Sequence, residues 1–410
     1  MMWLRLCFNN LILNKRRSIM AISLIIFSST SLLMSGGFVN FSFSSLATGM
    51  VNSGIGHVSI AHESYFNAQG SLRDNIISPE QRLLIEQKIS TLSDLDYYIK
   101  STKLDGLVAF GDNTKSIIIE ITEIDKRIKL ANFQFPIVAG SAPKNTEENP
   151  YQAILGINLA HSLGVNIGDT VVLLASTPDG GINAVDTQVS AILSTGIADI
   201  DVRTVMIPRA LMEPLLYENI TTNYSLVAKG EDNTNASSLF KQALPLFEGP
   251  SLQVKYWQDI AVYYKQVHSI YMIMFSFFFL MLGVVLFISI MNIMATVVLE
   301  RMKEAGTMLS FGFTVSRVRF NFFLEGMMLC IIGLLGSAGM TLILTLIVNH
   351  SGLMMPPPPG MSNSYPFLIQ LDMTVVLIDM LIVGVACMFA SYIPSRRVKN
   401  SSIVNLINHI

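Results

Sequence analysis

The sequence has few charged residues and no strongly basic region. Asp, Glu, Lys and Arg make up 14% of the 410 residues, against about 25% in ordinary soluble domains. The deficit is local, because long stretches carry no charge while the region from 48 to 266 has the composition of a globular domain. With a net charge of −2 and no basic domain, the chain lacks the electrostatic pattern of a nucleic-acid-binding protein.

The sequence also lacks common motifs of catalysis and metal binding. It has no GxxxxGK[ST] phosphate-binding loop, so the chain has no means of its own to hydrolyse ATP. HExxH, GxSxG and Cys/His clusters at zinc spacing are absent. His57 and His62 flank a predicted strand, where a five-residue step puts them on opposite faces. We therefore expect no catalytic, cofactor-binding or metal site, and we expect Cys7, Cys330 and Cys387 to be buried small hydrophobic residues.

Four apolar stretches are present, each long enough for a membrane-spanning helix, which needs about 20 residues. They run from 18 to 43, 271 to 298, 320 to 348 and 373 to 393. The first exceeds the apolar core of a cleaved signal peptide, so we expect it to be retained. Lys and Arg cluster in the N-terminal arm, in the loop after the second stretch and in the tail, and none lies between 349 and 371. The positive-inside rule therefore predicts cytoplasmic termini and an external large domain.

The predicted fold class is membrane α-helical, with four transmembrane helices, plus an α+β extracytoplasmic domain inserted between helices 1 and 2. The first segment, 1–17, is expected to be an amphipathic helix in the inner interface, or else a helical extension of the first span. The predicted segments are an arm at 1–17, helix 1 and stalk at 18–47, the outer domain at 48–266 with a candidate inserted subdomain at 133–220, helix 2 at 267–298, a cytoplasmic loop at 299–319, helix 3 at 320–348, a Pro-rich outer loop at 349–371, helix 4 at 372–393 and a cytoplasmic tail at 394–410.

Local patterns in the outer domain predict individual elements. Ser78, Pro79 and Gln81 have the spacing of a capping box with proline at the first helical position, so a helix should begin there. Two separate strands are predicted at 97–101 and 107–110.

The loop after the second apolar stretch carries a family signature. Its letters ERMKEAGTMLSFG (300–312) and LEG (324–326) resemble the ER-x-x-E-x-G-x-x-x-x-x-G…LEG pattern of the FtsX/MacB/LolC-type ABC transporter permeases. The tail PSRR (394–397) and the outer-domain run LGINLAHSLGVNIGDTVVLL (155–174) are also similar to that family. The resemblance covers essentially the whole chain. Ala305 departs from it, because the family usually has a larger aliphatic residue there.

The resemblance implies a permease subunit in a bacterial inner membrane, paired with an identical or different second permease copy. This pair would dock on a separate ABC ATPase dimer, which would bind ATP and Mg, and ATP-driven closure would move the periplasmic MacB-like domain. The expected substrates are lipoproteins or other acylated molecules, extracted from the outer leaflet among membrane lipids and passed to a periplasmic carrier. The alternatives are MacB-like efflux through an adaptor, and FtsX-like activation of a periplasmic hydrolase without transport.

The resemblance also assigns candidate residues. The candidates for ATPase coupling are Glu300, Arg301, Lys303, Glu304, Gly306 and Gly312. The charges of these residues by themselves would be equally consistent with a solvated cytoplasmic loop that follows the positive-inside rule. A soft apolar face that could hold acyl chains is formed by Met274, Phe275, Phe278 and Met281. Lipid-facing residues have the same composition, so this groove is the weaker assignment.

Two acids fall inside apolar stretches, where a charge is costly. Glu325 is expected to pair with Arg317, Arg319 or Arg396, or else to reach water at the interface. For Asp379, a hydrogen bond to Ser, Thr or Asn on a neighbouring helix is favoured over a proton relay, since a relay needs further acids at that depth.

Overall fold

The computed structural model describes residues 15–67, 71–131, 136–143, 150–230, 233–249, 251–356 and 365–396. These residues form two compact units. The first comprises the described parts of 1–44, 268–355 and 366–410, and the second comprises mainly the described parts of 45–267. The predictions for the arm at 1–14, for most of the Pro-rich loop and for the tail beyond Arg396 lie outside the described residues.

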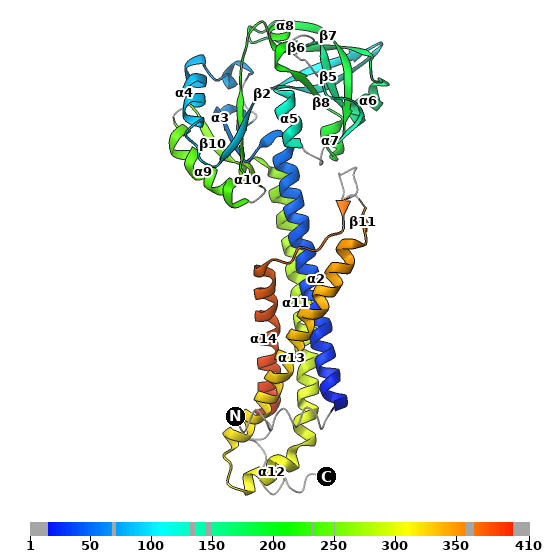
Figure 1. Cartoon of the computed structure of the whole chain (residues 1–410), viewed down its shortest axis with the longest axis vertical. Coiled ribbons are helices and arrows are strands. Elements are labelled where there is room, and N and C mark those ends of the chain that lie inside the picture. The colour runs from blue at the N-terminus through cyan, green and yellow to red at the C-terminus, as the bar shows by residue number, and fades with distance from the viewer. Residues whose placement is uncertain are drawn as a thin grey trace. The chain divides into compact units, whose positions relative to one another are not determined.

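The first unit is a bundle of long helices (Figure 1). Its long helices are α2 (Lys15–Met50), α11 (Val262–Glu300), α13 (Val315–His350) and α14 (Met373–Ser395), and the short α12 (Met302–Ser310) connects α11 to α13. Among the described residues, four helices are long and apolar enough to cross a membrane. Between α13 and α14, two short strands pair with each other, β11 (Met354–Met355) and β12 (Tyr365–Pro366).

Small residues on α13 let the helices of the bundle approach closely. A Cβ atom on Gly326 would overlap the side chain of Ser391 on α14, and one on Gly333 would lie 2.5 Å from Cγ2 of Ile25 on α2. Close backbone approach through small residues is the usual means of packing helices in lipid, where apolar burial between helices gives little driving force.

Substituting Gly326 with alanine is therefore expected to destabilise the bundle by about 1–3 kcal/mol, the usual cost of overpacking. Gly339 is the matched control on the same helix, because its added Cβ would meet nothing within 4 Å. Gly339→Ala should be neutral or slightly stabilising, since alanine is the better helix former. Thermal unfolding in detergent micelles compares the two, and equal shifts would contradict this packing.

The second unit is built on a ten-stranded mixed sheet, counted over the described residues. The strand order is β10-β1-β9-β2-β3-β8-β5-β7-β4, with β6 pairing both β2 and β7. The strands are β1 (Val58–Ala61), β2 (Leu95–Phe110), β3 (Asn113–Thr122), β4 (Ile137–Gly140), β5 (Gln152–Gly156), β6 (Thr170–Ser176), β7 (Ile182–Leu193), β8 (Thr204–Pro208), β9 (Asn223–Ala228) and β10 (Gln253–Tyr256).

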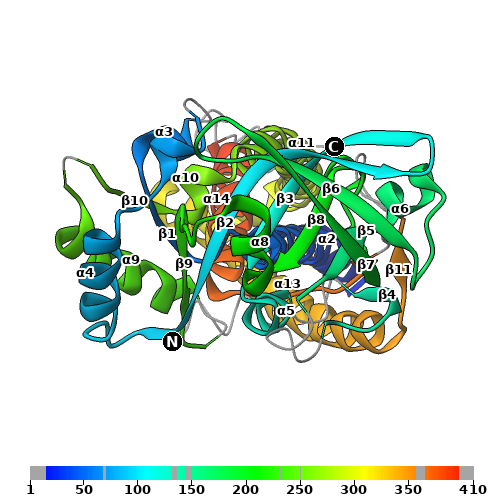
Figure 2. The ribbon, with the colours of Figure 1, turned by 90° about the horizontal axis from the view of Figure 1, so that it is seen from above.

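Helices lie toward both ends of this sheet (Figure 2), and the two largest apolar clusters of its core lie with them. One apolar cluster joins β1, β9 and β10 to α4 (Pro79–Ile89) and α9 (Asn233–Phe247). The other joins β3, β5, β6 and β8 to α6 (Ile157–Leu163) and α8 (Met212–Leu216). The remaining short helices are η1 (Val51–Ile55), α3 (Glu63–Phe66), η2 (Arg73–Asn75), α5 (Ile124–Ala131), α7 (Ala198–Asp201), η4 (Arg209–Leu211) and α10 (Trp257–Ile260).

The predicted capping box is confirmed, whereas the two short strands at 97–101 and 107–110 are wrong. Ser78 accepts from the backbone of Gln81, and the Gln81 side chain accepts from the backbone of Ser78. The two strand segments form one strand, β2, because β9, β3 and β6 together pair along its whole length. Gly106 lies within that strand, where a Cβ would come 2.6 Å from the Leu174 carbonyl oxygen, so the close pairing requires glycine.

Candidate functional site

The helix α12 has one buried face and one exposed face. Met302 and Ala305 are buried in a cluster with Val298 of α11 and with Val318 and Phe322 of α13. The exposed face carries a cation, an acid and two hydroxyls, namely Lys303, Glu304, Thr307 and Ser310. Ala305 is 1% exposed, so a larger residue there would have to displace its apolar neighbours.

The exposed face of α12 ends in an unusually exposed aromatic ring. Phe311 is 85% exposed and follows the last helical residue. Gly312 then takes φ +89°, a left-handed conformation that ends a helix at low cost only with glycine. Its N–H donates to the Leu309 carbonyl (3.0 Å), and the Phe313 N–H donates to the Met308 carbonyl (3.2 Å). The turn therefore holds Phe311 at a fixed, outward position.

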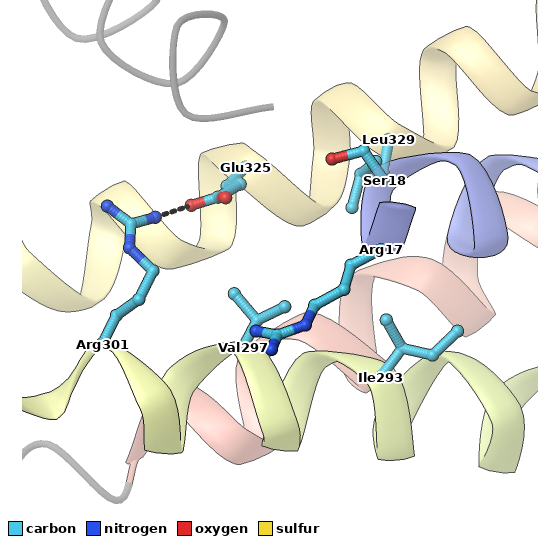
Figure 3. A pocket seen from close by; sticks show the side chains of 7 residues that line it. All are labelled: Arg17, Ser18, Ile293, Val297, Arg301, Glu325 and Leu329. Atoms are coloured by element: carbon cyan, nitrogen blue, oxygen red, sulfur yellow. Dashed lines mark hydrogen bonds and ion pairs between the residues drawn. The ribbon is translucent and has the colours of Figure 1, made fainter. Parts of the chain in front are cut away.

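Arg301 anchors α12 from inside the bundle. It is 8% exposed, its Nη1 donates to Glu325 Oε2 (2.8 Å), and its Nε donates to Glu304 Oε2 (2.7 Å). Figure 3 shows the guanidinium directed from the end of α11 toward Glu325 on α13. The predicted contact of Arg301 with an ATPase surface does not fit this burial, and we assign the side chain to positioning α12. Gly306 is buried as well, whereas Lys303 and Glu304 are exposed as predicted.

Glu325 has a different partner from those predicted. It pairs with Arg301 rather than with Arg317, Arg319 or Arg396, and it is only 4% exposed, so it is not an interfacial acid in water either. The physical reason is depth, because Glu325 lies about two turns farther into α13 than Arg317 and Arg319, where the Arg301 side chain reaches it from the end of α11.

A second ion pair lies beside the first. Arg17 near the start of α2 pairs with Glu300 at the end of α11. A small pocket lies beside the Arg301–Glu325 pair (Figure 3) and is lined by Arg17, Ser18, Ile293, Val297, Arg301, Glu325 and Leu329. Glu300 is thus exposed but already paired within the chain.

The four residues predicted as an acyl groove lie on α11, and three of them are uncovered. Met274, Phe278 and Met281 are 60%, 38% and 49% exposed, and their i, i+4, i+7 spacing puts them on one face. Phe275 is half-buried and stacks between Tyr271 and Phe279. The single chain therefore presents these residues as an open apolar surface.

The predicted hydrogen bond of Asp379 to a hydroxyl of a neighbouring helix is present. Asp379 on α14 lies 2.7 Å from Ser29 Oγ on α2. Asp379 is 4% exposed, and among the described residues no cationic side chain pairs with it.

In the outer unit, a buried arginine holds the turn η1. Arg127 on α5 is 3% exposed and donates from Nη1 to the Asn52 carbonyl (2.9 Å) and from Nη2 to the Ser53 carbonyl (2.6 Å). Its Nε donates to Glu120 Oε1 (3.2 Å) on β3. Burial by itself raises the pKa of Glu120, but Lys103 and Arg127 outweigh it and leave the pKa below its ordinary value.

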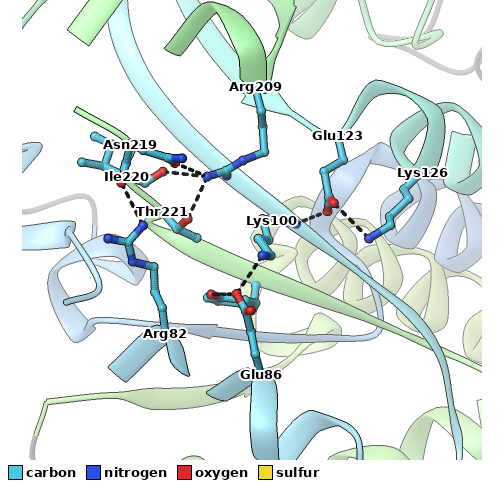
Figure 4. Close-up of polar contacts among 10 residues, drawn as sticks. Arg82, Glu86, Lys100, Glu123, Lys126, Arg209, Asn219, Ile220 and Thr221 are labelled. Atoms are coloured by element: carbon cyan, nitrogen blue, oxygen red, sulfur yellow. Dashed lines mark hydrogen bonds and ion pairs between the residues drawn. The ribbon is translucent and has the colours of Figure 1, made fainter. Parts of the chain in front are cut away.

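A polar network joins further elements of the outer unit (Figure 4). Glu86 on α4 accepts from Lys100 Nζ (2.7 Å) and from the Tyr224 hydroxyl (3.0 Å). Arg82 and Arg209 both donate to the 219–221 segment. These contacts link α4, β2 and β9, so their charges have structural partners. Among the described residues, no group of three or more His, Cys, Asp or Glu side chains is placed to hold a metal ion.

His57 is held neutral beside β1. Its Nδ1 accepts from the Ala228 backbone N–H (3.1 Å), and burial lowers the pKa of the imidazole to about 4. Unfolding exposes the ring and restores a pKa of about 6.5. Below that pH the unfolded chain binds a proton that the folded chain does not, so the stability of the outer unit should fall as the pH is lowered from about 6.5 toward 4.

His57→Asn is expected to flatten this dependence, because the asparagine oxygen can accept from Ala228 without titrating. Thermal unfolding of both proteins between these two pH values measures the difference. Parallel pH profiles would show that His57 does not cause the loss.

Some of these residues were not identified from sequence. In the sequence, Arg17 is one of several cations of a basic arm, and Arg127 carries no signal, since a lone arginine in a polar helix is normally solvated. The Arg301–Glu325 pair has no sequence signal of its own, because several cations lie near the ends of the same helices.

The described chain thus combines four helices that are long and apolar enough to cross a membrane with a large mixed-sheet unit. The family model for the FtsX-like permease C-terminal region matches residues 274–403. This part of the chain, which contains α12 and its anchor, is therefore similar to the FtsX-like permease C-terminal region, in agreement with the resemblance found in the sequence. No curated protein matches the chain.

Solved structures show weaker likenesses. The extracellular domain of the noncanonic ABC-type transporter YknZ from Gram-positive bacteria is 12% identical, covers 48% of this chain and 98% of its own, and has a TM-score of 0.35. The periplasmic region of MacB from Actinobacillus actinomycetemcomitans is 11% identical, covers 53% of this chain and 95% of its own, and has a TM-score of 0.34. TM-scores of this size assign neither fold nor function.

Proposed function

We propose that this chain is the permease subunit of an ABC transporter and that α12 is its docking element for a separate ATPase. The observation that carries the proposal is an exposed helix face fixed on a buried anchor, within the region that matches the FtsX-like family. The sequence has no phosphate-binding loop, so the energy source has to be another chain. Lys303, Thr307 and Phe311 supply a charge, a hydroxyl and an apolar ring for the partner to bind.

A second copy of the permease completes the proposed assembly. In a bilayer the open apolar surface at Met274, Phe278 and Met281 would face lipid, and we assign it to contact with a partner helix or an acylated substrate. We further propose that acylated molecules, with lipoproteins as the leading class, are extracted from the outer leaflet. Efflux of peptides or drugs through an adaptor, and activation of a periplasmic hydrolase, are the competing outcomes of a substrate search.

The docking proposal is tested with Phe311→Ser. Loss of a buried aromatic contact is typical of an interface hot spot, so ATPase binding should weaken about tenfold or more. Leu353 is the matched control, since it is 54% exposed beyond the other end of α13. Leu353→Ser should leave both ATPase binding and ATP turnover unchanged. Affinity is measured with the purified permease in nanodiscs and the ATPase that co-purifies with it; equal binding by wild type and Phe311→Ser would refute docking through α12.

A further inference from the structure

A carboxyl and two hydroxyls form a continuous chain across three helices of the bundle. Asp379 of α14, Ser29 of α2 and Ser337 of α13 are 4%, 0% and 1% exposed. Asp379 Oδ2 lies 2.7 Å from Ser29 Oγ, which lies 2.9 Å from Ser337 Oγ. The Ser337 hydroxyl lies in turn 2.8 Å from the Leu334 carbonyl oxygen. Each of the three distances is a good hydrogen-bond distance between oxygens.

Three hydrogen bonds need three hydrogens, and the two serines supply only two. If the carboxyl is protonated, Asp379 donates to Ser29, Ser29 donates to Ser337, and Ser337 donates to the Leu334 carbonyl. If it is ionised, Ser29 must donate to the carboxylate. Ser337 can then serve either Ser29 or Leu334, which leaves one of the short oxygen–oxygen contacts without a hydrogen.

The surroundings of Asp379 also favour the neutral acid. Its second oxygen, Oδ1, is buried and has no hydrogen-bond partner, which suits the carbonyl oxygen of a neutral acid better than a charged carboxylate. The titratable group that interacts with it is the thiol of Cys330 on α13, which is hydrogen-bonded to Cys387 on α14. The charged residues of α2 and α11 lie toward the ends of those helices, at Lys15, Arg16, Arg17, Lys265, His268 and Glu300.

We propose that Asp379 is an intramembrane proton-binding site that joins α2, α13 and α14. The bound proton completes the hydrogen-bonded chain and removes a charge from an apolar bundle. Release of the proton creates an unpaired carboxylate, which the three helices can accommodate only by separating enough to admit water. Packing of α14 is thereby linked to proton occupancy, independently of any ATPase.

Difference infrared spectroscopy tests this on the full chain in lipid nanodiscs. The spectrum of the wild type minus that of the Asp379→Asn variant should show the carbonyl stretch of a protonated carboxylic acid at neutral pH. Ser29→Ala should shift that band to higher frequency, because the hydrogen bond is lost. The asparagine amide can donate to Ser29 in place of the acid, so the Asp379→Asn variant should keep the bundle folded. The signal of Glu325 cancels in the difference spectrum because this residue is present in both proteins.

A pH titration of the wild type alone gives a second measurement that needs no folded variant. Thermal stability should fall as the pH rises above about 4, where the unfolded acid releases its proton and the folded acid does not, and it should stop falling at the alkaline pH where the acid band disappears. Carboxylate bands alone at neutral pH, or a carboxylate band that responds to sodium instead of pH, would overturn the proposal. Failure of ATPase docking would not affect either measurement.

Discussion

Arg301→Met is expected to be the most destabilising single change in the bundle, costing about 3–5 kcal/mol, because it leaves a buried carboxylate without its partner. The side chains of Arg301 and Glu325 are 10% and 5% exposed, so water cannot replace the lost contact. Glu325→Leu should cost less, because the guanidinium loses its buried partner but keeps the exposed Glu304. Arg301→Met also releases α12, which Arg301 holds through Glu304.

The double variant Arg301→Met/Glu325→Leu separates pairing from packing. Replacing both charges with apolar groups of similar size is often neutral, so the double variant should recover most of the loss. Unfolding by detergent titration of wild type, both single variants and the double variant completes the cycle. If the two single losses simply add, the ion pair does not hold this end of the bundle together.

Arg127→Met should have the second largest effect, about 3 kcal/mol, since it removes a buried guanidinium that makes three hydrogen bonds, although Lys103 still offsets the charge of Glu120. In this case Glu120 loses its hydrogen bond, and the carbonyls of Asn52 and Ser53 lose theirs. Gly54 adds to the constraint, because a Cβ there would lie 2.9 Å from Arg127 Nε. The turn η1 should open, which hydrogen exchange of residues 51–56 would report.

Lys126→Met is the matched control one residue earlier on α5. Lys126 pairs with Glu123 at 3.0 Å, but its side chain is 38% exposed. A surface pair of this kind contributes about 0–1 kcal/mol, so stability and exchange near η1 should hardly change. Comparable exchange in both variants would mean that Arg127 does not fix the turn.

Apolar runs predicted the long helices of the fold well, whereas the orientation inferred from the basic loops stays a prediction. The four long helices follow from stretches without charge, and the capped helix at Ser78 follows from three residues whose spacing has a direct hydrogen-bonding reason. The length of β2 could not be predicted from its local sequence. The strand continues past Gly106 because β3 and β6 pair with it there.

The candidate site was predicted in part. The position of α12 and the turn at Gly312 follow from the family signature and from the need for glycine at positive φ. Which face of α12 is buried could not be predicted. The sequence shows two nearby cations, Arg301 and Lys303, and only the fold places a buried carboxylate, Glu325, beside Arg301. Likewise, nothing in the sequence distinguishes Ser29 from other small residues of its apolar helix, and only the fold shows that it lies beside Asp379.

Photo-crosslinking at position 311 in native membranes tests the central claim most directly, namely that α12 docks on an ATPase. A photoreactive residue replacing Phe311 should give adducts to an ABC ATPase, identified by mass spectrometry, whereas the same residue at Leu353 should give none. Adducts at 311 to lipid or to a second permease copy, with no ATPase among them, would contradict the claim.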